Sequence, residues 1–483
     1  GETANANAPA LMPFTTFVPA ATGVVTIGIF TGIVLIVRWG LSAQRRVRRT
    51  QSIASHPLKF LAPRNRGESV FLYEEQLKLP MVSMVMPVKW AAIKSRSPKE
   101  NWKSQLVSMY SGSIEAIFAV ESEDDGAVQV VKELQEELAH LEGVTIKVAV
   151  AGPATTCSQK IANILAALRA VSPESRYIFC MDANCKLHPG TVHLLMNELE
   201  NDASVFVATG YPFDMPPENA SIWAWTMAQF RYNCLSEFLS NRSTFVWGGA
   251  MVLRRADVEQ NMYGLLDWWR KGGYSDDMQV QACAQDAGRM IATPLSAIFP
   301  NELKKDVTFD YCWGFLRRQN WVLFTYSSWK NWARHMTLLF LYAVPNASWL
   351  PAFLLSLASL AEAPLRPARL TEPAVAIHLA ACVGFLITFH AAIAVQRRNL
   401  EAIANMCNHL SPEAQRLSLA QFTPFCLGSS LLMQSALAPA VTIANLLNTS
   451  MEWGNIRYKC RWGRVVEVQH PHSSPVRVSQ SLT

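Results

Sequence analysis

The segment IFCMDANCKLHPG, Ile178–Gly190, decides the fold prediction, because an apolar run within it ends at two oxygen-bearing side chains. The run before Asp182 has the length and composition of a buried strand. Asp182 and Asn184 therefore follow a strand end, which is where parallel sheets bind ligands. Two such side chains suit a hard divalent cation that bridges a diphosphate. The alternative is an aspartate that only caps the turn before Pro189.

Other short apolar runs surround this strand and alternate with segments of helical periodicity, as in residues 130–141 and 160–171. Strands that alternate with helices indicate a mostly parallel sheet, so we predict an α/β domain over residues 79–330. The expected strands are VSMVMPV (82–88), EAIFAVES (115–122), TIKVAVA (145–151), RYIFCMDA (176–183) and SVFVATGYP (204–212).

The composition indicates membrane-spanning segments beside this domain. Hydrophobic residues make up 50% of the chain and charged residues 17%, whereas about a quarter of a typical soluble protein is charged. Residues 17–39 carry no charge before Arg38 and are long enough to span a bilayer. Arginines at 45, 46, 48 and 49 follow this stretch. Because basic residues favour the cytosolic side, we expect a transmembrane helix over residues 17–39 and a domain that faces the cytosol.

The chain becomes apolar again after the predicted domain. Apolar runs at 336–360, 373–394 and 422–447 predict membrane-associated helices within residues 331–450, and residues 451–483 form a basic tail. A cytosolic domain and a cytosolic tail require an even number of crossings between them. We therefore expect one of the three runs to re-enter the membrane or to lie flat at its surface.

Charge and cysteine content exclude several classes of function. The net charge is only +6, and no basic block carries interleaved aromatic residues, so no nucleic-acid partner is expected. The basic residues lie instead beside apolar runs, which indicates anionic lipid headgroups as neighbours. The ten cysteines contain no CxxC pair, so neither a disulfide framework nor a zinc site is predicted.

Three further polar segments are candidates for chemistry, and each has a plainer alternative. The segment ESEDDGA, residues 121–127, follows a predicted strand and is otherwise a solvated turn. Asp276 and Asp277 enter a helix, where one acid can cap the helix and the other can act as a general base. Arg317 and Arg318 in FLRRQNW can hold a diphosphate, or can contact lipid headgroups next to the membrane.

In this order, the four segments resemble the lipid-modifying inverting glycosyltransferases of the GT-A type, and most of all the ceramide glucosyltransferase family. Acids of that family near DDPA, CDSG and ED correspond to those in EDDGA, MDANC and SDD, and its (Gln/Arg)-x-x-Arg-Trp motif corresponds to RRQNW. The segments SQKIAN (158–163), WGGAMVLRR (247–255) and NIRYKCRWG (455–463) also resemble family segments. The likeness extends from Phe17 to about Gly463.

The resemblance implies a GT-A nucleotide-diphospho-sugar transferase fold, with one N-terminal transmembrane helix and a C-terminal membrane-associated helical region. It implies transfer of glucose from UDP-glucose to the primary hydroxyl of ceramide with inversion, in a membrane protein of the Golgi or the endoplasmic reticulum. Asp277 would be the catalytic base beside Asp276, and Asp182 and Asn184 would hold Mg²⁺ or Mn²⁺. The implied UDP-sugar contacts are Pro87, Glu121, Asp124, Asp125, Lys160, Asn163, Arg317, Arg318, Gln319 and Trp321.

One departure from the family motif is Asn320, which stands where the family has arginine. A carboxamide can still donate a hydrogen bond but carries no charge, and Arg318 can compensate from the adjacent position. Two alternatives keep part of this interpretation. One is a transferase that acts on another lipid or on a polysaccharide, and the other is a membrane scaffold whose domain has lost catalysis. UDP-galactose is a possible donor in place of UDP-glucose.

Overall fold

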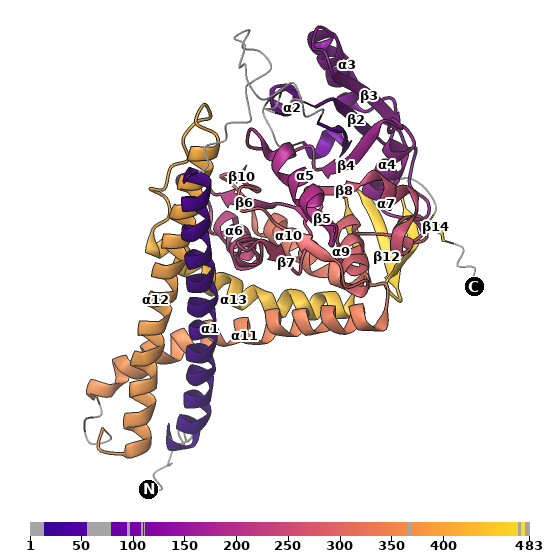
Figure 1. Ribbon diagram of the computed structural model, residues 1–483. Coiled ribbons are helices and arrows are strands. Elements are labelled where there is room, and N and C mark those ends of the chain that lie inside the picture. The colour runs from indigo at the N-terminus through magenta and orange to yellow at the C-terminus, as the bar shows by residue number, and fades with distance from the viewer. Residues whose placement is uncertain are drawn as a thin grey trace, which may run out of the picture.

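The computed structural model describes residues 14–55, 79–93, 97–107, 110, 112–365, 367, 370–471 and 475–478. A domain of strands and helices rests on a group of long helices, as Figure 1 shows. The domain contains the predicted α/β region, and the long helices come from both ends of the chain. The predicted α/β class is therefore confirmed.

The main sheet has eight strands in the order β3-β2-β1-β4-β8-β5-β9-β7. Strands β1 to β4 are parallel to one another, and β8 runs antiparallel between β4 and β5. The parallel strands therefore end at one edge of the sheet, where the antiparallel β8 begins. The strands are β1 (Met81–Pro87), β2 (Ile114–Val120), β3 (Val144–Val150), β4 (Ser175–Met181), β5 (Val205–Thr209), β7 (Arg242–Ser243), β8 (Ala250–Arg254) and β9 (Met290–Ala292).

The predicted strand over residues 204–212 is two strands. It breaks at Gly210, after which β6 (Tyr211–Met215) leaves the main sheet and pairs with β10 (Ile298–Glu302). A Cβ atom at Gly210 would lie 2.4 Å from the carbonyl oxygen of Ala297. The close approach of these two segments therefore requires glycine at this position.

Helices cover both faces of the sheet. The predicted helices at 130–141 and 160–171 correspond to α3 and α4. The helices of the domain are α2 (Pro98–Leu106), α3 (Gly126–Leu138), α4 (Gln159–Leu168), α5 (Thr191–Asn201), α6 (Ile222–Leu235), α7 (Arg255–Glu259), α8 (Leu265–Arg270), α9 (Asp276–Asp286) and α10 (Phe309–Trp321). Apolar side chains of β1, β2 and β4 lie in two buried clusters, one on each face of the sheet.

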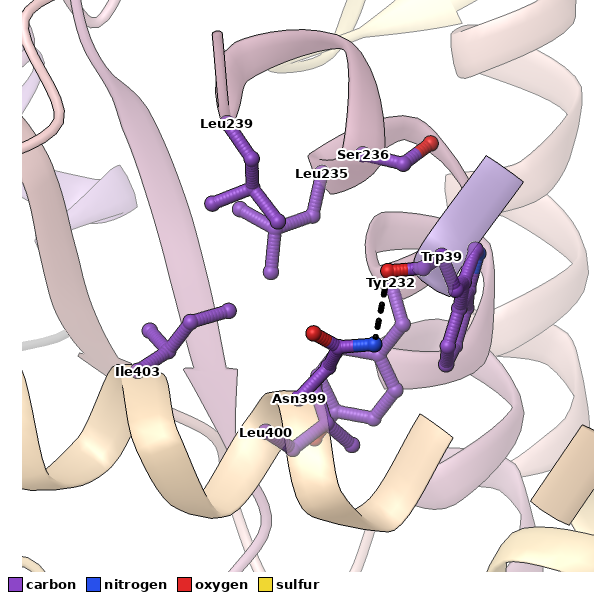
Figure 2. A pocket seen from close by; sticks show the side chains of 8 residues that line it. All are labelled: Trp39, Tyr232, Leu235, Ser236, Leu239, Asn399, Leu400 and Ile403. Atoms are coloured by element: carbon purple, nitrogen blue, oxygen red, sulfur yellow. Dashed lines mark hydrogen bonds between the residues drawn. The ribbon is translucent and has the colours of Figure 1, made fainter. Parts of the chain in front are cut away.

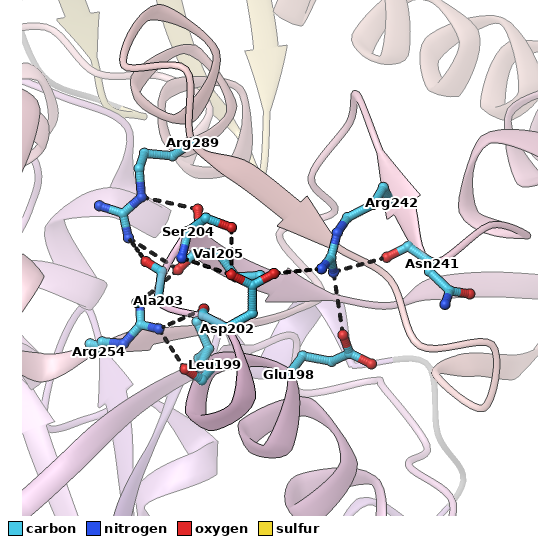
Figure 3. A network of polar contacts seen from close by, with 10 residues as sticks. All are labelled: Glu198, Leu199, Asp202, Ala203, Ser204, Val205, Asn241, Arg242, Arg254 and Arg289. Carbon is cyan, nitrogen blue, oxygen red and sulfur yellow. Dashed lines mark hydrogen bonds and ion pairs between the residues drawn. The ribbon is translucent and has the colours of Figure 1, made fainter.

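Three arginines fix the turn that joins α5 to β5, as Figure 3 shows. Arg242 forms an ion pair with Asp202 at 2.8 Å. Arg254 donates to the carbonyl oxygens of Leu199 and Val205, and Arg289 donates to that of Ala203. Carbonyl groups at this helix end, which lack helical partners, are thereby satisfied.

A buried carboxylate joins β1, β2 and β3 below the ligand-binding edge. Glu115 is fully buried and accepts hydrogen bonds from Ser83 at 2.5 Å and from the backbone and hydroxyl of Ser172 at 3.0 and 2.6 Å. It also forms an ion pair with Lys147. Burial alone would raise the pKa of Glu115, but these partners lower it below its usual value.

We expect Glu115→Leu to destabilise the domain by about 3 kcal/mol, because it leaves buried polar partners unsatisfied. The stability that Glu115 contributes is present above the usual carboxyl pKa of 4.5 and is lost as the pH falls through the lowered folded-state pKa. The thermal midpoint of the Glu115→Leu variant should therefore lie well below that of the unmodified protein at pH 7, and this difference should become smaller in acid. A difference in midpoint that is equally large at all pH values would contradict a stabilising role of the charged Glu115 carboxylate.

Among the described residues, four helices are long and apolar enough to cross a membrane: α1 (Phe14–Ser55), α11 (Trp329–Glu362), α12 (Pro373–Leu410) and α13 (Pro424–Leu447). The N-terminal helix continues well beyond the predicted end at Trp39. The structure does not describe the side chains of its arginines at 45, 46, 48 and 49. Helices α1 and α12 run side by side, whereas α11 and α13 run side by side across the base of the domain (Figure 1). Which of these helices cross a membrane, and whether one lies at its surface, stays a prediction.

The N-terminal helix contacts the domain near Arg38 and Trp39. A small cavity there is lined by α1, α6, the loop after α6 and α12 (Figure 2). The side-chain amide of Asn399 donates to the carbonyl oxygen of Trp39 at 3.1 Å across this junction. Arg38 forms an ion pair with Glu237 nearby, so polar contacts fix α1 against both the domain and α12.

The predicted basic tail is a folded sheet over most of its length. Four antiparallel strands follow α13: β11 (Ser450–Trp453), β12 (Ile456–Arg461), β13 (Arg464–Gln469) and β14 (Val476–Arg477). Ile456, Tyr458 and Cys460 alternate with exposed basic residues and are buried. They pack with Tyr274 and Trp321, so this sheet belongs to the domain.

Candidate active site

One lysine joins two of the predicted acidic segments. The ammonium group of Lys160, near the start of α4, lies 3.0 Å from Asp182 Oδ1 and 3.0 Å from Asp276 Oδ2. Asp182 follows β4, and Asp276 begins α9, so segments far apart in the sequence converge here. Lys160 also donates to the carbonyl oxygen of Gly248 at 3.2 Å. The sequence did not predict that Lys160 would pair with these two acids.

The two glycines before β8 form the centre of this cluster. The backbone N–H of Asp182 donates to Gly249 O at 3.0 Å, and Gly248 N–H donates to Asp277 Oδ2 at 2.9 Å. A Cβ atom at Gly248 would lie 2.7 Å from Asp276 Oδ2. Glycine is therefore needed at position 248 for the carboxylates to approach the backbone this closely.

Asp276 and Asp277 have different surroundings although they are adjacent. Asp276 is 4% exposed, and burial raises its pKa to about 7, even though Lys160 favours the charged form. Asp277 is more accessible and accepts from Ser275, from Met278 N–H at 2.8 Å and from Gly248. The alternative of a helix cap thus applies to Asp277 in part, because it accepts from backbone N–H groups, yet it is also the more accessible acid of the two.

The cluster carries more negative than positive charge. Three carboxylates, Asp182, Asp276 and Asp277, face the single ammonium group of Lys160. Burial by itself would lower the pKa of Lys160, but the three acids raise it above its usual value, so the lysine is charged. The remaining negative charge suits a divalent cation or a second cationic group.

The ends of β1 and β2 form the other side of the site. The amide of Asn163 is buried and donates to Ala119 O at 3.0 Å, which fixes α4 to β2, the neighbour of β1. Pro87 ends β1, and Glu121 follows β2 directly. These predicted donor contacts therefore lie at the edge where nucleotides bind in such sheets.

The acids after Glu121 divide into two kinds. Asp125 accepts from Ala127 N–H at 2.9 Å and is the N-cap of α3, so the alternative of a capped turn describes it well. Asp124 is exposed on the same turn. Neither residue contacts the Lys160 cluster through a described interaction, and their contact with a donor stays a prediction.

The C-terminal sheet also forms part of this edge, which the sequence analysis missed. The ring of His470 lies 3.5 Å from Glu121 and 2.8 Å from the carbonyl oxygen of Ala154. The Tyr458 hydroxyl accepts from the backbone N–H of Gln159, at the start of α4, at 3.1 Å. The alternation of apolar and basic residues in IRYKCR, residues 456–461, was the available signal for a strand.

Helix α10 connects this site to the membrane helices, and its two arginines face different ways. Arg317 donates through Nε to the side-chain oxygen of Asn445 in α13 at 3.1 Å. Arg318 interacts electrostatically with Tyr274, two residues before Asp276, and burial lowers its pKa. Within the described part of the chain, the Arg318 side chain has no hydrogen bond or ion pair. The contact of either arginine with a diphosphate stays a prediction.

The rest of the RRQNW segment is largely interior. Trp321 is fully buried and its ring contacts that of Tyr274 with centroids 4.6 Å apart. Asn320 is 2% exposed, and Gln319 is half-buried. Trp321 therefore supports Tyr274 from within the domain, and its contact with an acceptor stays a prediction. Asn320 leaves this buried position without a charge.

A metal ion would find only part of its ligands in the protein. Among the described residues, no group of three or more His, Cys, Asp or Glu side chains is arranged to hold a metal. The side chain of Asp182 is 42% exposed and the cluster has excess negative charge. These features fit a cation that takes its remaining ligands from a substrate diphosphate and water, as Mg²⁺ commonly does.

The comparison with protein families supports one class of protein. Residues 64–265, which contain most of the main sheet and Asp182, match the family model described as glycosyl transferase family 21. This match supports a nucleotide-sugar glycosyltransferase, and with the mixed sheet it agrees with the predicted GT-A fold. The matched range ends before Asp276 and Arg318. No curated protein matches the chain.

Similarity to solved structures is distant. A mannosyltransferase from Pyrobaculum calidifontis, in complex with GDP-Man and Mn²⁺, matches with 11% identity and a TM-score of 0.38, covering 75% of this chain and 98% of that one. TarS 1-349 from S. aureus matches with 8% identity and a TM-score of 0.30, covering 83% and 99%. Neither likeness assigns a donor or an acceptor to this protein.

Proposed function

We propose that the protein transfers glucose from UDP-glucose to the primary hydroxyl of ceramide, with inversion, giving glucosylceramide. The observation that carries the proposal is the convergence of Asp182, Lys160, Asp276 and Asp277 at one sheet edge, one helix away from the membrane helices. The family 21 match supports a nucleotide-sugar donor, and the choice of glucose and ceramide follows the sequence resemblance to ceramide glucosyltransferases. The catalytic domain would face the cytosol in the endoplasmic reticulum or the Golgi.

The donor would lie along the carboxyl ends of the parallel strands. The uridine would occupy the edge formed by Pro87, Glu121 and the start of α4, and the diphosphate would lie beside Asp182. Mg²⁺ or Mn²⁺, held by Asp182 with Asn184, would neutralise charge on the departing UDP. Lys160 would keep Asp182 and Asp276 in place, and Arg318 would contact the diphosphate from α10.

Asp277 would act as the general base. It removes the proton from the ceramide hydroxyl as the oxygen bonds to the anomeric carbon, and the bond from that carbon to the phosphate oxygen breaks. The proton stays on the Asp277 carboxyl group, and the electron pair leaves with UDP. A single displacement inverts the anomeric carbon and forms no covalent sugar–enzyme intermediate.

The acceptor would reach this site from the membrane along α10. Helix α10 contacts α13 through the Arg317–Asn445 hydrogen bond and shares a buried apolar cluster with α6 and α13. A ceramide held by its chains in the bilayer can therefore present its hydroxyl without leaving the lipid. Full extraction would be costly, since each buried methylene is worth about 0.8 kcal/mol.

We expect Arg318→Ala to raise the KM for the nucleotide sugar by about 10-fold or more, because a charge-assisted hydrogen bond to phosphate is lost. Arg317→Ala is the matched control, since that side chain is bonded to Asn445 in α13. It should lower thermal stability with little change in KM. The assignment would be wrong if Arg317→Ala raised the KM and Arg318→Ala did not.

The proposal is tested by measuring UDP release from the purified full chain in lipid nanodiscs, with a panel of UDP-sugars and with ceramide present or absent. We expect release that depends on ceramide and is fastest with UDP-glucose. Release without ceramide but with a growing polysaccharide would favour the polysaccharide alternative. No release with any UDP-sugar would favour a scaffold that has lost catalysis.

A further inference from the structure

The turn between β12 and β13 contains a tryptophan, Trp462, which is an unfavourable residue for the backbone conformation of this turn. Trp462 and Gly463 join the two strands, and both have positive φ angles, 53° and 78°. Two-residue hairpin turns of this kind favour Asn-Gly and similar pairs, because bulky side chains are disfavoured at positive φ. Trp462 is nevertheless 74% exposed to solvent. An unfavourable backbone and an exposed indole both indicate a role outside the folded domain.

The same sheet contains an internal comparison. The turn between β11 and β12 consists of Gly454 and Asn455, which also have positive φ angles, 60° and 65°. These are ordinary residues for such a turn. The two turns lie at opposite ends of β12, so the tryptophan is confined to one end of the strand.

That end of the strand lies against the start of a candidate membrane helix. The backbone N–H of Tyr326 donates to Gly463 O at 3.3 Å, and three residues later α11 begins at Trp329. Trp329 is 72% exposed and stacks on Trp332, with ring centroids 4.8 Å apart. In Figure 1 the yellow C-terminal strands extend down to the end of α11 at which the helix begins, beside the layer formed by α11 and α13.

Exposed basic residues lie next to these tryptophans in the sequence, and the acids nearby have basic neighbours: Asp286 pairs with Arg334, and Glu452 and Glu467 lie opposite Arg457 and Lys459. Lys330 and Arg461 are both exposed beside the exposed tryptophans, and Arg457 and Lys459 continue the same outer face of β12. Tryptophan is enriched at the level of lipid headgroups, and basic residues near it are attracted to anionic lipids. Helix α11 supplies continuity with the bilayer, since its candidate span starts at Trp329.

We propose that the Trp462–Gly463 turn is a membrane-surface anchor, which together with Trp329 and Trp332 sits in the headgroup layer of a bilayer that contains anionic lipid. The anchor is joined through β12 to Tyr458, which holds the start of α4, and so connects the lipid surface with the donor edge of the sheet. The inference concerns the position of this turn and holds whichever sugar or acceptor the protein uses.

The experiment places a polarity-sensitive fluorophore on the full chain through Trp462→Cys, with Asn455→Cys as the matched control at the other turn. Of the ten native cysteines, Cys234 and Cys426 are partly exposed, so the chain without a new cysteine supplies the background. The chains are placed in nanodiscs of phosphatidylcholine and phosphatidylglycerol, with or without lipid that carries a nitroxide at its headgroup.

We expect the fluorophore at 462 to be quenched by the nitroxide lipid at least three-fold more than the one at 455, and to be protected from aqueous iodide. Equal iodide access at both positions would overturn the proposal. Protection from iodide without nitroxide quenching would also overturn it, since a protein surface such as a second copy would then cover the turn.

A second variant separates the anchor from folding. Trp462→Asn places a favoured residue in the turn, so the thermal midpoint of the full chain should stay the same or rise. A clear fall in the midpoint would show that Trp462 packs within the fold, and would contradict the role of a surface anchor.

Discussion

Asp277→Asn should lower the kcat for glycosyl transfer by about 10²- to 10⁴-fold, the range that a positioned general base contributes. Asparagine has nearly the same shape and can still accept one of the backbone hydrogen bonds that Asp277 accepts, but it cannot take the proton of the acceptor hydroxyl. Binding of UDP should therefore stay within about three-fold of that of the unmodified chain. Initial rates with ceramide, together with calorimetric titration of UDP, measure both quantities.

The matched control for this prediction lies on the same helix. Asp286 ends α9 and forms an ion pair with Arg334, away from the Lys160 cluster. Asp286→Asn makes the same chemical change and should leave kcat within about two-fold. Full activity in Asp277→Asn would remove it as the base and would direct attention to Asp276, whose pKa of about 7 also suits proton transfer.

Asp182→Asn should lower kcat/KM by about 100-fold or more, because charge that develops on the leaving diphosphate loses its counter-ion. The substitution should also reduce the dependence of UDP binding on Mn²⁺. Lys160 keeps its contact with Asp276 in this variant, so the fold should remain intact. Titration of UDP at several Mn²⁺ concentrations separates this effect from a general loss of affinity.

A comparison with Asn184→Ala shows how much each of Asp182 and Asn184 contributes to holding the metal ion. We expect a smaller effect, about 10-fold, since a neutral oxygen ligand contributes less than a carboxylate. If Asp182→Asn retained both its UDP affinity and its response to Mn²⁺, the assignment of Asp182 to the metal and diphosphate would be wrong.

Strands β1 to β5 could be predicted because each is a short apolar run that ends in polar residues, whereas β7 and β9, of two and three residues, were not predicted. The break at Gly210 could not, since a continuous run of nine residues does not show that the chain changes sheets within it. Strand β12 in the C-terminal segment was not predicted, because its apolar residues alternate with basic ones and the segment therefore resembles a charged tail. These misses come from tertiary contacts, namely the approach of Ala297 to Gly210 and the packing of Tyr458 against Tyr274.

The position of Asp182 could be predicted because parallel strands end at one edge. Its pairing with Lys160 could not, because the two residues come from neighbouring structural units whose relative placement depends on the Gly248–Gly249 turn. Which of Arg317 and Arg318 bonds to α13 could not be predicted either. Adjacent residues on a helix point about 100° apart, and only the packing of α10 against α13 decides which arginine contacts Asn445.

The structure of the lipid product tests directly whether the protein transfers glucose to ceramide with inversion. The full chain in nanodiscs is supplied with ceramide and UDP-glucose that is isotopically labelled at the anomeric carbon, and the product is analysed by mass spectrometry and nuclear magnetic resonance. We expect glucose joined through a β-linkage to the primary hydroxyl of ceramide. An α-linked product, or UDP formed with glucose released to water and no glycolipid, would contradict it.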